Sequence, residues 1–216
     1  MKEMNSQRGN ALFLILIAVA LFAALSYAVT QSGRGGGTVD KENAMIAAGQ
    51  ITQYPAGLRT AVTRMILTGT AATTIKLDTT ATVGVFAPDG GGAVSETPPS
   101  GIGNAAAWSY SSVSGATGFY VKDVGTNTDG TGFEALASLY DVSVPVCAQI
   151  NKGLGLSSTI AQTSDTPNPE EGQGQATYML GDNVIDAIPG QAFACISEGG
   201  HFSPLGYIYY HTLIEQ

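Results

Sequence analysis

The chain has 216 residues, 17 acidic against 9 basic side chains and a net charge of −8, and only 12% of its residues are charged. An acidic surface without a basic run repels phosphate backbones, so nucleic acid is excluded as an expected partner. The length allows one domain with its own core beside an N-terminal segment.

The N-terminal segment is strongly apolar, and residues 11–30 contain no charged side chain. Twenty helical residues at about 1.5 Å each cover roughly 30 Å, the thickness of a bilayer's hydrocarbon core. We therefore predict a transmembrane helix over residues 10–30, in contact with membrane lipid. Lys2 and Arg8 precede the apolar run. The positive-inside rule then keeps the N-terminus cytoplasmic and the rest of the chain outside the cytoplasm.

Three fates are open to this segment. Ser26, Tyr27 and Ala28 form a small-residue site at which a conventional signal peptide could be cleaved. An uncleaved anchor is equally compatible with the hydrophobicity. In the third case the segment is recognised from the cytoplasmic side, where Arg8 and Gly9 end a short leader directly before the apolar run.

This leader, its final glycine and the apolar helix behind it resemble the class III signal of type IV pilins and type II secretion pseudopilins. The resemblance implies that a prepilin peptidase cleaves after Gly9, and that the mature chain begins at Asn10 with a methylated amine. It also implies residence in the bacterial inner membrane and assembly with other pilin-like subunits through the N-terminal helices. Leu14 stands at the fifth mature position, where these families usually carry a glutamate that pairs with a neighbour's terminal amine.

One face of the predicted membrane helix carries small residues. Ala20, Ala24 and Ala28 recur at a spacing of four, which is typical of helices that approach closely in lipid. Alanine is also common in membrane helices that have no such partner. The stripe is therefore interpreted as a candidate helix-packing face.

A glycine-rich joint is predicted over residues 31–37, because each glycine costs a helix about 1 kcal/mol relative to alanine. A second helix is expected from Thr38, as its N-cap. Pro55 is expected to kink or divide this helix and to push Tyr54 towards an extended conformation. Its apolar positions follow a spacing of four and three, which predicts a single buried face that in a pilin packs on the sheet. These positions are Ala44, Ala48, Ile51, Pro55, Leu58, Val62 and Met65.

The remainder of the chain is predicted to be a mainly antiparallel sheet, which gives an α+β fold. The expected elements are short strands in 73–86, a loop over 87–104, a hairpin around 114–117, a strand within 133–144, a loop over 157–176, and strands at 192–195 and 207–214. A short helix is predicted after Ser143, with Pro145 in its first turn and Gly153 at its end. The predicted organisation is a leader (1–9), a transmembrane helix (10–30), a joint (31–37) and an extracytoplasmic pilin-like domain (38–216).

The chain contains two cysteines, Cys147 and Cys195. In an oxidising extracytoplasmic compartment a disulfide is the natural state of such a pair. Two buried free thiols are the alternative. A disulfide would tie the short helix to a late strand.

No catalytic motif is supported. Gly101 and Gly103 imitate part of a dinucleotide fingerprint, but they follow a proline pair rather than a strand. The two histidines, His201 and His211, have no nucleophile that the sequence identifies, and a structural or surface role is expected for them. The sequence therefore predicts neither an enzyme nor a small-molecule substrate.

Calcium is the one metal for which the sequence offers candidate ligands. Asp123, Asn127 and Asp129 lie in a glycine-bearing segment and could supply side-chain oxygens to Ca²⁺, although their spacing is not that of an EF-hand. Asp, Asn and Gly are also ordinary turn residues, so a solvated turn is the preferred interpretation and no cofactor is predicted.

Two functions remain open. The first is a structural subunit, major or minor, of a type IV pilus-like or pseudopilus filament. The second is an extracytoplasmic binding or adhesion module, either membrane-anchored or released after Ala28.

Overall fold

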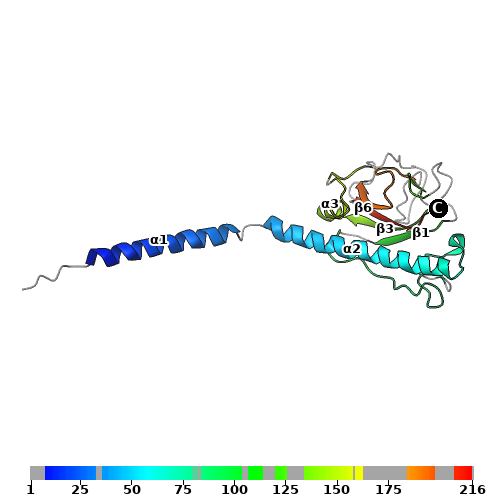
Figure 1. Ribbon diagram of the computed structural model, residues 1–216, viewed down its shortest axis with the longest axis horizontal. Helices are drawn as coiled ribbons and strands as arrows, with labels where there is room; N and C mark the ends of the chain where they lie inside the picture. Colours follow the sequence, from blue (N-terminus) through cyan, green and yellow to red (C-terminus); the bar gives the residue numbers. More distant parts are fainter. Residues whose placement is uncertain are drawn as a thin grey trace, which may run out of the picture. The chain divides into compact units, whose positions relative to one another are not determined.

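The computed structural model describes residues 8–32, 36–79, 81, 84–103, 107–113, 120–125, 134–157, 159–162, 184–197 and 207–215 (Figure 1). In the two N-terminal helices, side chains are described from Leu12 to Ala28 and again from Asp40 onwards. The chain divides into two compact units, Met1–Glu42 and Asn43–Gln216, and each is described by itself.

The first unit consists mainly of helix α1, which spans Arg8–Ser32. Its described side chains, from Leu12 to Ala28, are all exposed. The part of the chain that the structure describes contains no helix with both the length and the hydropathy needed to cross a membrane. Membrane spanning by residues 10–30 stays a prediction from the sequence.

Helix α2 spans Gly36–Leu67, so it begins two residues before the expected N-cap at Thr38. The cost of a glycine in a helix is small enough for Gly36 and Gly37 to be included in the first turn. Residues 33–35, in the predicted joint, lie outside the described residues. The expected apolar face is confirmed, since all seven of its positions are buried.

The prediction that Pro55 divides α2 was wrong, because Tyr54 and Pro55 are both helical within one continuous element. A proline inside a helix costs about 3 kcal/mol through its missing N–H and its clash with the preceding turn. Burial of each large apolar side chain contributes about 1.5–3 kcal/mol. Ile51, Leu58 and Val62 are all buried on the same face, so tertiary packing outweighs the local cost.

The second unit contains a four-stranded antiparallel sheet with the order β1-β3-β6-β5. Its strands are β1 (Trp108–Ser111), β3 (Ala135–Val142), β5 (Phe193–Ser197) and β6 (Tyr207–Ile214). This confirms the α+β class, the strand within 133–144 and the two late strands. Residues 198–206, between β5 and β6, lie outside the described residues.

The sheet lies between two layers. The apolar face of α2 packs on one side, where Leu58 and Val62 share a cluster with Ala137 and Leu213 (Figure 1). The other side is covered by a parallel pair of two-residue strands, β2 (Tyr120–Val121) and β4 (Val184–Ile185). Val121 and Ile185 pack there against Tyr210 of β6.

The expected strands in residues 73–86 are absent from the described part of this segment, which contains a 3-10 helix, η1 (Ala72–Thr74), and turns. Ile75, Leu77 and Val85 are buried singly from a loop, so their apolar alternation reflects burial without a ladder. Close backbone approach requires glycine here, because a Cβ on Gly90 would lie 2.0 Å from the Gly84 carbonyl oxygen. The loop expected over 87–104 is confirmed as far as residue 103.

The hairpin expected around residues 114–117 was also wrong. Trp108 and Tyr110 lie in β1, which pairs with β3, whereas Val121 lies in β2, which pairs with β4 in a different sheet. Each segment has a local strand pattern, but its partner is chosen by long-range packing. Residues 114–119 themselves lie outside the described residues.

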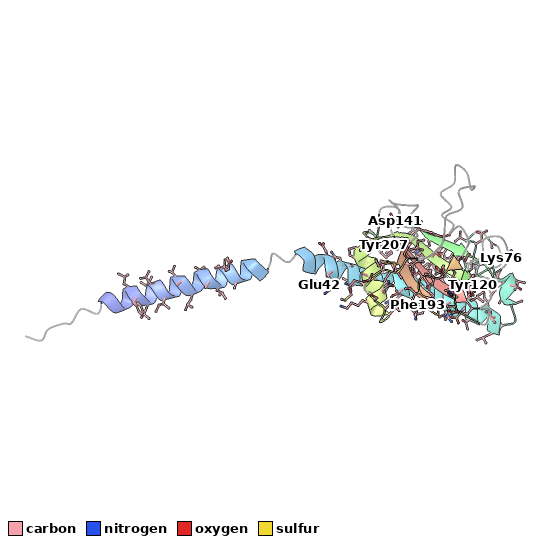
Figure 2. The ribbon with its side chains drawn as sticks, turned by 90° about the horizontal axis from the view of Figure 1, so that it is seen from above. Glu42, Lys76, Tyr120, Asp141, Phe193 and Tyr207 are labelled. Atoms are coloured by element: carbon pink, nitrogen blue, oxygen red, sulfur yellow. A yellow bond between two sulfur atoms is a disulfide. The ribbon has the colours of Figure 1, made fainter. Side chains whose placement is uncertain are left out.

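Helix α3 spans Val144–Gly153, with Ser143 before it and Pro145 in its first turn, as expected. The Ser143 side chain makes no cap hydrogen bond. Val146, Cys147 and Ile150 are buried against Tyr209 of β6 and Ile51 of α2. Figure 2 shows the two ends of the second unit: Tyr207 of β6 and Asp141 of β3 lie towards one end, and Lys76 lies towards the other.

Candidate functional sites

Helix α1 presents large apolar side chains that are exposed on every side, from 40% at Ile17 to 72% at Phe22. Leu14 is 60% exposed, Leu21 65% and Phe22 72%. Large contiguous apolar surfaces of this kind mark interaction sites with lipid or protein. The predicted packing residues Ala20, Ala24 and Ala28 are exposed in the same helix. Gly9 and Asn10, at the predicted processing site, are helical, and the Asn10 side chain lies outside the described set.

The predicted disulfide is confirmed. Cys147 of α3 and Cys195 of β5 are joined by an S–S bond of 2.03 Å across a sequence separation of 48. Both residues are fully buried. The free-thiol alternative is thereby set aside, and α3 is covalently fixed beside the outer edge of β5.

A second contact, not predicted from the sequence, joins α3 to the same residue. Asn151 lies one helical turn after Cys147 and is fully buried. Its Nδ2 donates to the Cys195 carbonyl oxygen at 2.8 Å, and its Oδ1 accepts from the Cys195 N–H at 2.9 Å. The side-chain amide thus supplies both hydrogen bonds that a neighbouring strand would supply. A short helix that carries cysteine and asparagine four residues apart was the only sequence signal for it.

The outer edge of β5 is closed further along. The Ser197 N–H donates to the Ala161 carbonyl oxygen at 2.9 Å, and Gln162 forms a parallel bridge with Ser197. Cys195 and Ser197 are two outward-facing positions of β5, since residues 194 and 196 direct their backbone groups to β6. Both outward amides are therefore satisfied.

The other edge of the sheet is formed by β1. Tyr140 N donates to the Ala107 carbonyl oxygen at 3.5 Å, and the strand register places residue 109 opposite 138 and 111 opposite 136. In an antiparallel ladder, bonded pairs recur at every second residue. Ser109 and Ser111 therefore bond to β3, whereas Trp108 and Tyr110 direct their backbone N–H and C=O groups outward. Among the described residues, these outward groups have no backbone partner.

Two clefts lie beside the β1 edge, and residues 96 and 97 line both of them. The first, the edge cleft, has a volume of about 830 Å³ and lies between β1 and residues 76–79 and 95–98. The second, the α2 cleft, has a similar volume of about 830 Å³ and is lined by residues of α2 between Gln50 and Arg64, by residues 91–94, 96 and 97, and by Pro99 and Trp108. Glu96, Thr97 and Trp108 line both clefts.

Aromatic side chains form a rigid wall beneath the open edge. Trp108 packs on Tyr54 of α2, with ring centroids 5.0 Å apart, and Tyr110 packs on Phe86 at 5.2 Å. The hydroxyls of Tyr54 and Tyr110 are hydrogen-bonded at 2.7 Å. Burial, with a further contribution from the Tyr54 hydroxyl, raises the pKa of Tyr110 above its ordinary value. These contacts hold β1 in place without using its outer backbone groups.

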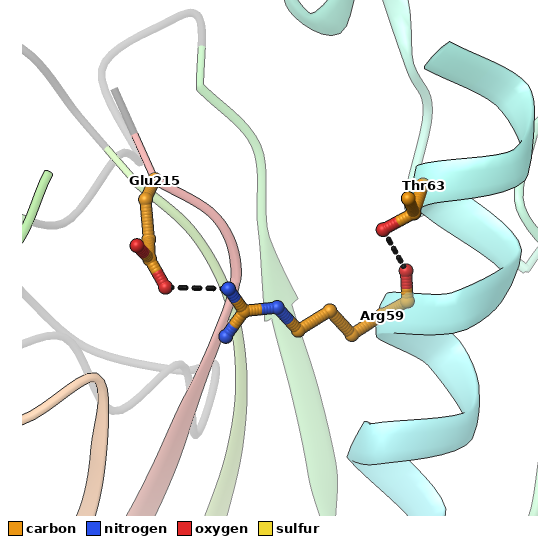
Figure 3. A network of polar contacts seen from close by, with 3 residues as sticks. All are labelled: Arg59, Thr63 and Glu215. Atoms are coloured by element: carbon orange, nitrogen blue, oxygen red, sulfur yellow. Dashed lines mark hydrogen bonds and ion pairs between the residues drawn. The ribbon is translucent and has the colours of Figure 1, made fainter. Parts of the chain in front are cut away.

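An ion pair joins α2 to the end of β6. Arg59 Nη2 lies 2.6 Å from Glu215 Oε1, and Thr63 Oγ1 donates to the Arg59 carbonyl oxygen at 2.8 Å (Figure 3). The two charged side chains are 40% and 34% exposed, so solvent screens the pair and its contribution is below about 1 kcal/mol.

Glu134 is a buried carboxyl group that sequence reasoning did not single out. It directly precedes β3, and its Oε2 accepts the Val121 N–H at 2.8 Å. Its Oε1 has no hydrogen-bond partner among the described residues. Burial raises the pKa of Glu134 to about 7, and hydrogen bonding to Val121 opposes this increase. One acidic residue beside an apolar strand was the only signal in the sequence.

His211 has the structural role expected of it. It is buried in β6, stacks on Phe193 at a centroid distance of 4.7 Å, and its Nδ1 is hydrogen-bonded to the Tyr209 hydroxyl at 2.9 Å. Burial, and next the charge of Arg59, lower the pKa of His211 to about 4. The ring is therefore neutral at pH 7. His201 lies outside the described residues.

The calcium hypothesis remains a prediction. Asp123 lies in a turn with φ of 60°, and Asn127 and Asp129 lie outside the described residues. The described residues contain no group of three or more His, Cys, Asp or Glu side chains arranged to hold a metal ion.

Comparisons with protein-family models, with curated proteins and with solved structures found no match for this chain.

Proposed function

We propose that this chain is a structural subunit of a type IV pilus-like or pseudopilus filament. In this proposal the apolar segment of residues 10–30 holds the subunit in the bacterial inner membrane, with the second unit outside the cytoplasm. A prepilin peptidase removes the leader after Gly9, and the mature chain begins at Asn10 with a methylated amine. Neighbouring subunits then pack through their N-terminal helices.

The observation that carries the proposal is the exposed apolar surface of α1. Leu12, Leu16 and Leu25 are each more than 60% exposed, as are the other large side chains around the helix at Phe13, Val19 and Tyr27. Covering such a surface with lipid or with other helices contributes about 25 cal/mol for each Å² removed from water. Helix α1 thus has a strong physical reason to leave water.

The disulfide supports the proposed compartment. A buried Cys147–Cys195 bridge is typical of proteins that fold in an oxidising environment. The positive-inside rule leads to the same side of the membrane, independently of the cysteines.

Because of Leu14, the proposed mode of assembly differs from that of the pilin families that the N-terminal segment resembles. A leucine cannot pair with a neighbour's terminal amine as a glutamate can. Packing would rest on apolar contacts and on the close approach that Ala20, Ala24 and Ala28 permit.

Mass spectrometry of the native N-terminal peptide tests the proposal. A mature chain that begins at Asn10 with a methylated amine is the expected result, and a Gly9→Val variant should retain Met1. Ser6→Val, in the same leader, is the matched control and should be processed normally. An unprocessed Met1 in the native protein would indicate a plain anchor and would contradict the proposal.

The two clefts favour a second candidate, an extracytoplasmic binding or adhesion module. A module released by conventional signal cleavage would begin at Val29. The same peptide measurement therefore separates the two functions.

A further inference from the structure

We propose that the edge cleft binds an extended polypeptide segment from a partner protein, which adds to β1 as a further antiparallel or parallel strand. The site is formed by the outer backbone groups of Trp108 and Tyr110, with residues 76–79 and 95–98 as the facing walls. This inference does not depend on how the N-terminus is processed.

The backbone chemistry of the edge selects the class of ligand. Trp108 and Tyr110 each present one N–H donor and one C=O acceptor, two residues apart on the same side of the strand. Only another extended backbone offers donors and acceptors at this alternating spacing of about 6.6 Å. Strand addition of this kind obtains its affinity from main-chain hydrogen bonds and its selectivity from side-chain contacts.

The cleft has the size that such a segment needs. β1 has four residues, which corresponds to about 13 Å of extended chain. The cleft of about 830 Å³ is lined on one side by Trp108, Ser109 and Tyr110 of this strand and on the other by residues 76–79 and 95–98. A whole folded subunit would meet these walls, so a single extended segment is the better fit.

The charged side chains on the cleft walls indicate which side chains the bound segment carries. Lys76 and Glu96 are both exposed on the facing walls, and no ion pair joins them. Ser95, Thr97 and Ser109 add hydroxyl groups to the lining. A segment with small β-forming residues and one side chain of each charge is therefore complementary to the cleft.

The two edges of the sheet differ in how their outward backbone groups are satisfied. Proteins ordinarily block exposed sheet edges, because unpaired edges recruit other chains. Here Asn151 and Ala161 close the β5 edge at Cys195 and Ser197, whereas Trp108 and Tyr110 of β1 line a cleft.

The test uses the full chain in detergent micelles and the synthetic peptide acetyl-Thr-Lys-Val-Thr-Val-Glu-Thr-amide. Trp108 is the only tryptophan in the chain and lines the cleft, so its fluorescence reports binding. At a peptide concentration about ten times Kd, amide exchange at Trp108 and Tyr110 should slow about tenfold. Exchange at Ser109 and Ser111, which already bond to β3, should not change, and these amides are the internal control.

Two N-methylated forms of the peptide test the hydrogen bonds directly. Methyl groups on every second nitrogen remove either the donors that face β1 or those that face away. One form should lose at least about tenfold in affinity and the other should bind like the parent, since each lost pair costs roughly 1.4 kcal/mol or more. Equal binding of both forms would overturn the proposal, as would absence of parent binding at about 1 mM.

A charge variant locates the peptide. Lys76→Glu should weaken binding about two- to fivefold, because it replaces the partner of the peptide's glutamate. Lys41→Glu makes the same change at an exposed position of α2 outside the cleft, and its affinity should match that of the wild type. Equal effects of the two variants would contradict the site. Protection of Tyr110 through dimerisation without peptide would assign the edge to a second copy and would also overturn the proposal.

Discussion

The two edges of the four-stranded sheet are treated differently by the rest of the chain. At β5, α3 is held by a disulfide, and Asn151 and Ala161 satisfy the outward amides of Cys195 and Ser197. At β1, aromatic packing fixes the strand through its side chains, while Trp108 and Tyr110, whose backbone groups point away from β3, line a cleft. The difference shows that an edge can be rigid without being closed. Rigidity comes from side-chain packing, and closure comes from hydrogen bonds in the plane of the sheet.

The largest expected effect comes from breaking the covalent link at the closed edge. Cys147→Ser should lower the free energy of unfolding by about 4 kcal/mol, because the 48-residue loop is no longer constrained in the unfolded chain. Thermal unfolding under oxidising conditions measures the loss. The wild type under full reduction should behave like the variant, and an unchanged melting temperature would show that the bridge contributes nothing.

The hydrogen bonds at the closed edge should have the next largest effect. Asn151→Ala leaves the buried N–H and C=O of Cys195 unpaired, at a cost of about 1–3 kcal/mol for each group, or about 3 kcal/mol in total. Urea unfolding with the disulfide intact measures this term separately. Lys152→Ala, at the next residue on the exposed side of α3, is the matched control and should change stability by less than about 0.5 kcal/mol. Equal losses in the two variants would refute a special role for Asn151.

The smallest of the three effects on stability is expected from Glu134. This residue directly precedes β3, the strand that pairs with β1, and it lies two residues before Leu136, the partner of Ser111. Its pKa is raised to about 7 in the folded chain, so the folded state holds the proton more tightly than the unfolded state. The stabilisation is complete below the unfolded pKa of about 4.3 and is lost as the pH rises through 7. Glu134→Gln should remove this dependence, which amounts to about 2 kcal/mol between pH 5.5 and pH 8.

His211 changes the pH dependence of stability in the opposite direction, so its contribution has to be separated from that of Glu134. Its pKa is lowered to about 4, so the unfolded chain binds more protons between pH 4 and pH 6.5, and stability rises with pH there. The difference between wild type and Glu134→Gln at each pH isolates the glutamate. If that difference is constant from pH 4.5 to pH 8, the raised pKa of Glu134 is wrong.

Local patterns predicted the elements whose residues carry a single periodic signal. The seven-residue stripe of α2 identified its buried face, and the run from Ser143 to Gly153 identified α3. The signal failed where residues 73–86 alternate in hydrophobicity but form turns. Side chains buried one at a time from a loop have the same alternation as a strand.

Some residues of the candidate sites could be predicted from the sequence, and others could not. Cys147 and Cys195 were predicted from their type and compartment, because oxidising conditions favour pairing whatever the fold. Asn151 and Glu134 could not be predicted, because an asparagine or a glutamate becomes informative only when burial removes water from it. The open edge of β1 depends on strand order, and the sequence suggested a hairpin partner that β1 does not have.

The sequence by itself determined the apolar N-terminal run, the amphipathic face of α2, the α+β class and the cysteine pair. Each of these follows from composition or from a period of a few residues, so neighbouring positions contain the whole signal. Only the tertiary structure decided that α2 continues through Pro55, that α3 closes one edge of the sheet, and that β1 leaves the other edge facing a cleft. These outcomes depend on contacts between residues far apart in the chain, where burial and hydrogen-bond geometry outweigh local preference.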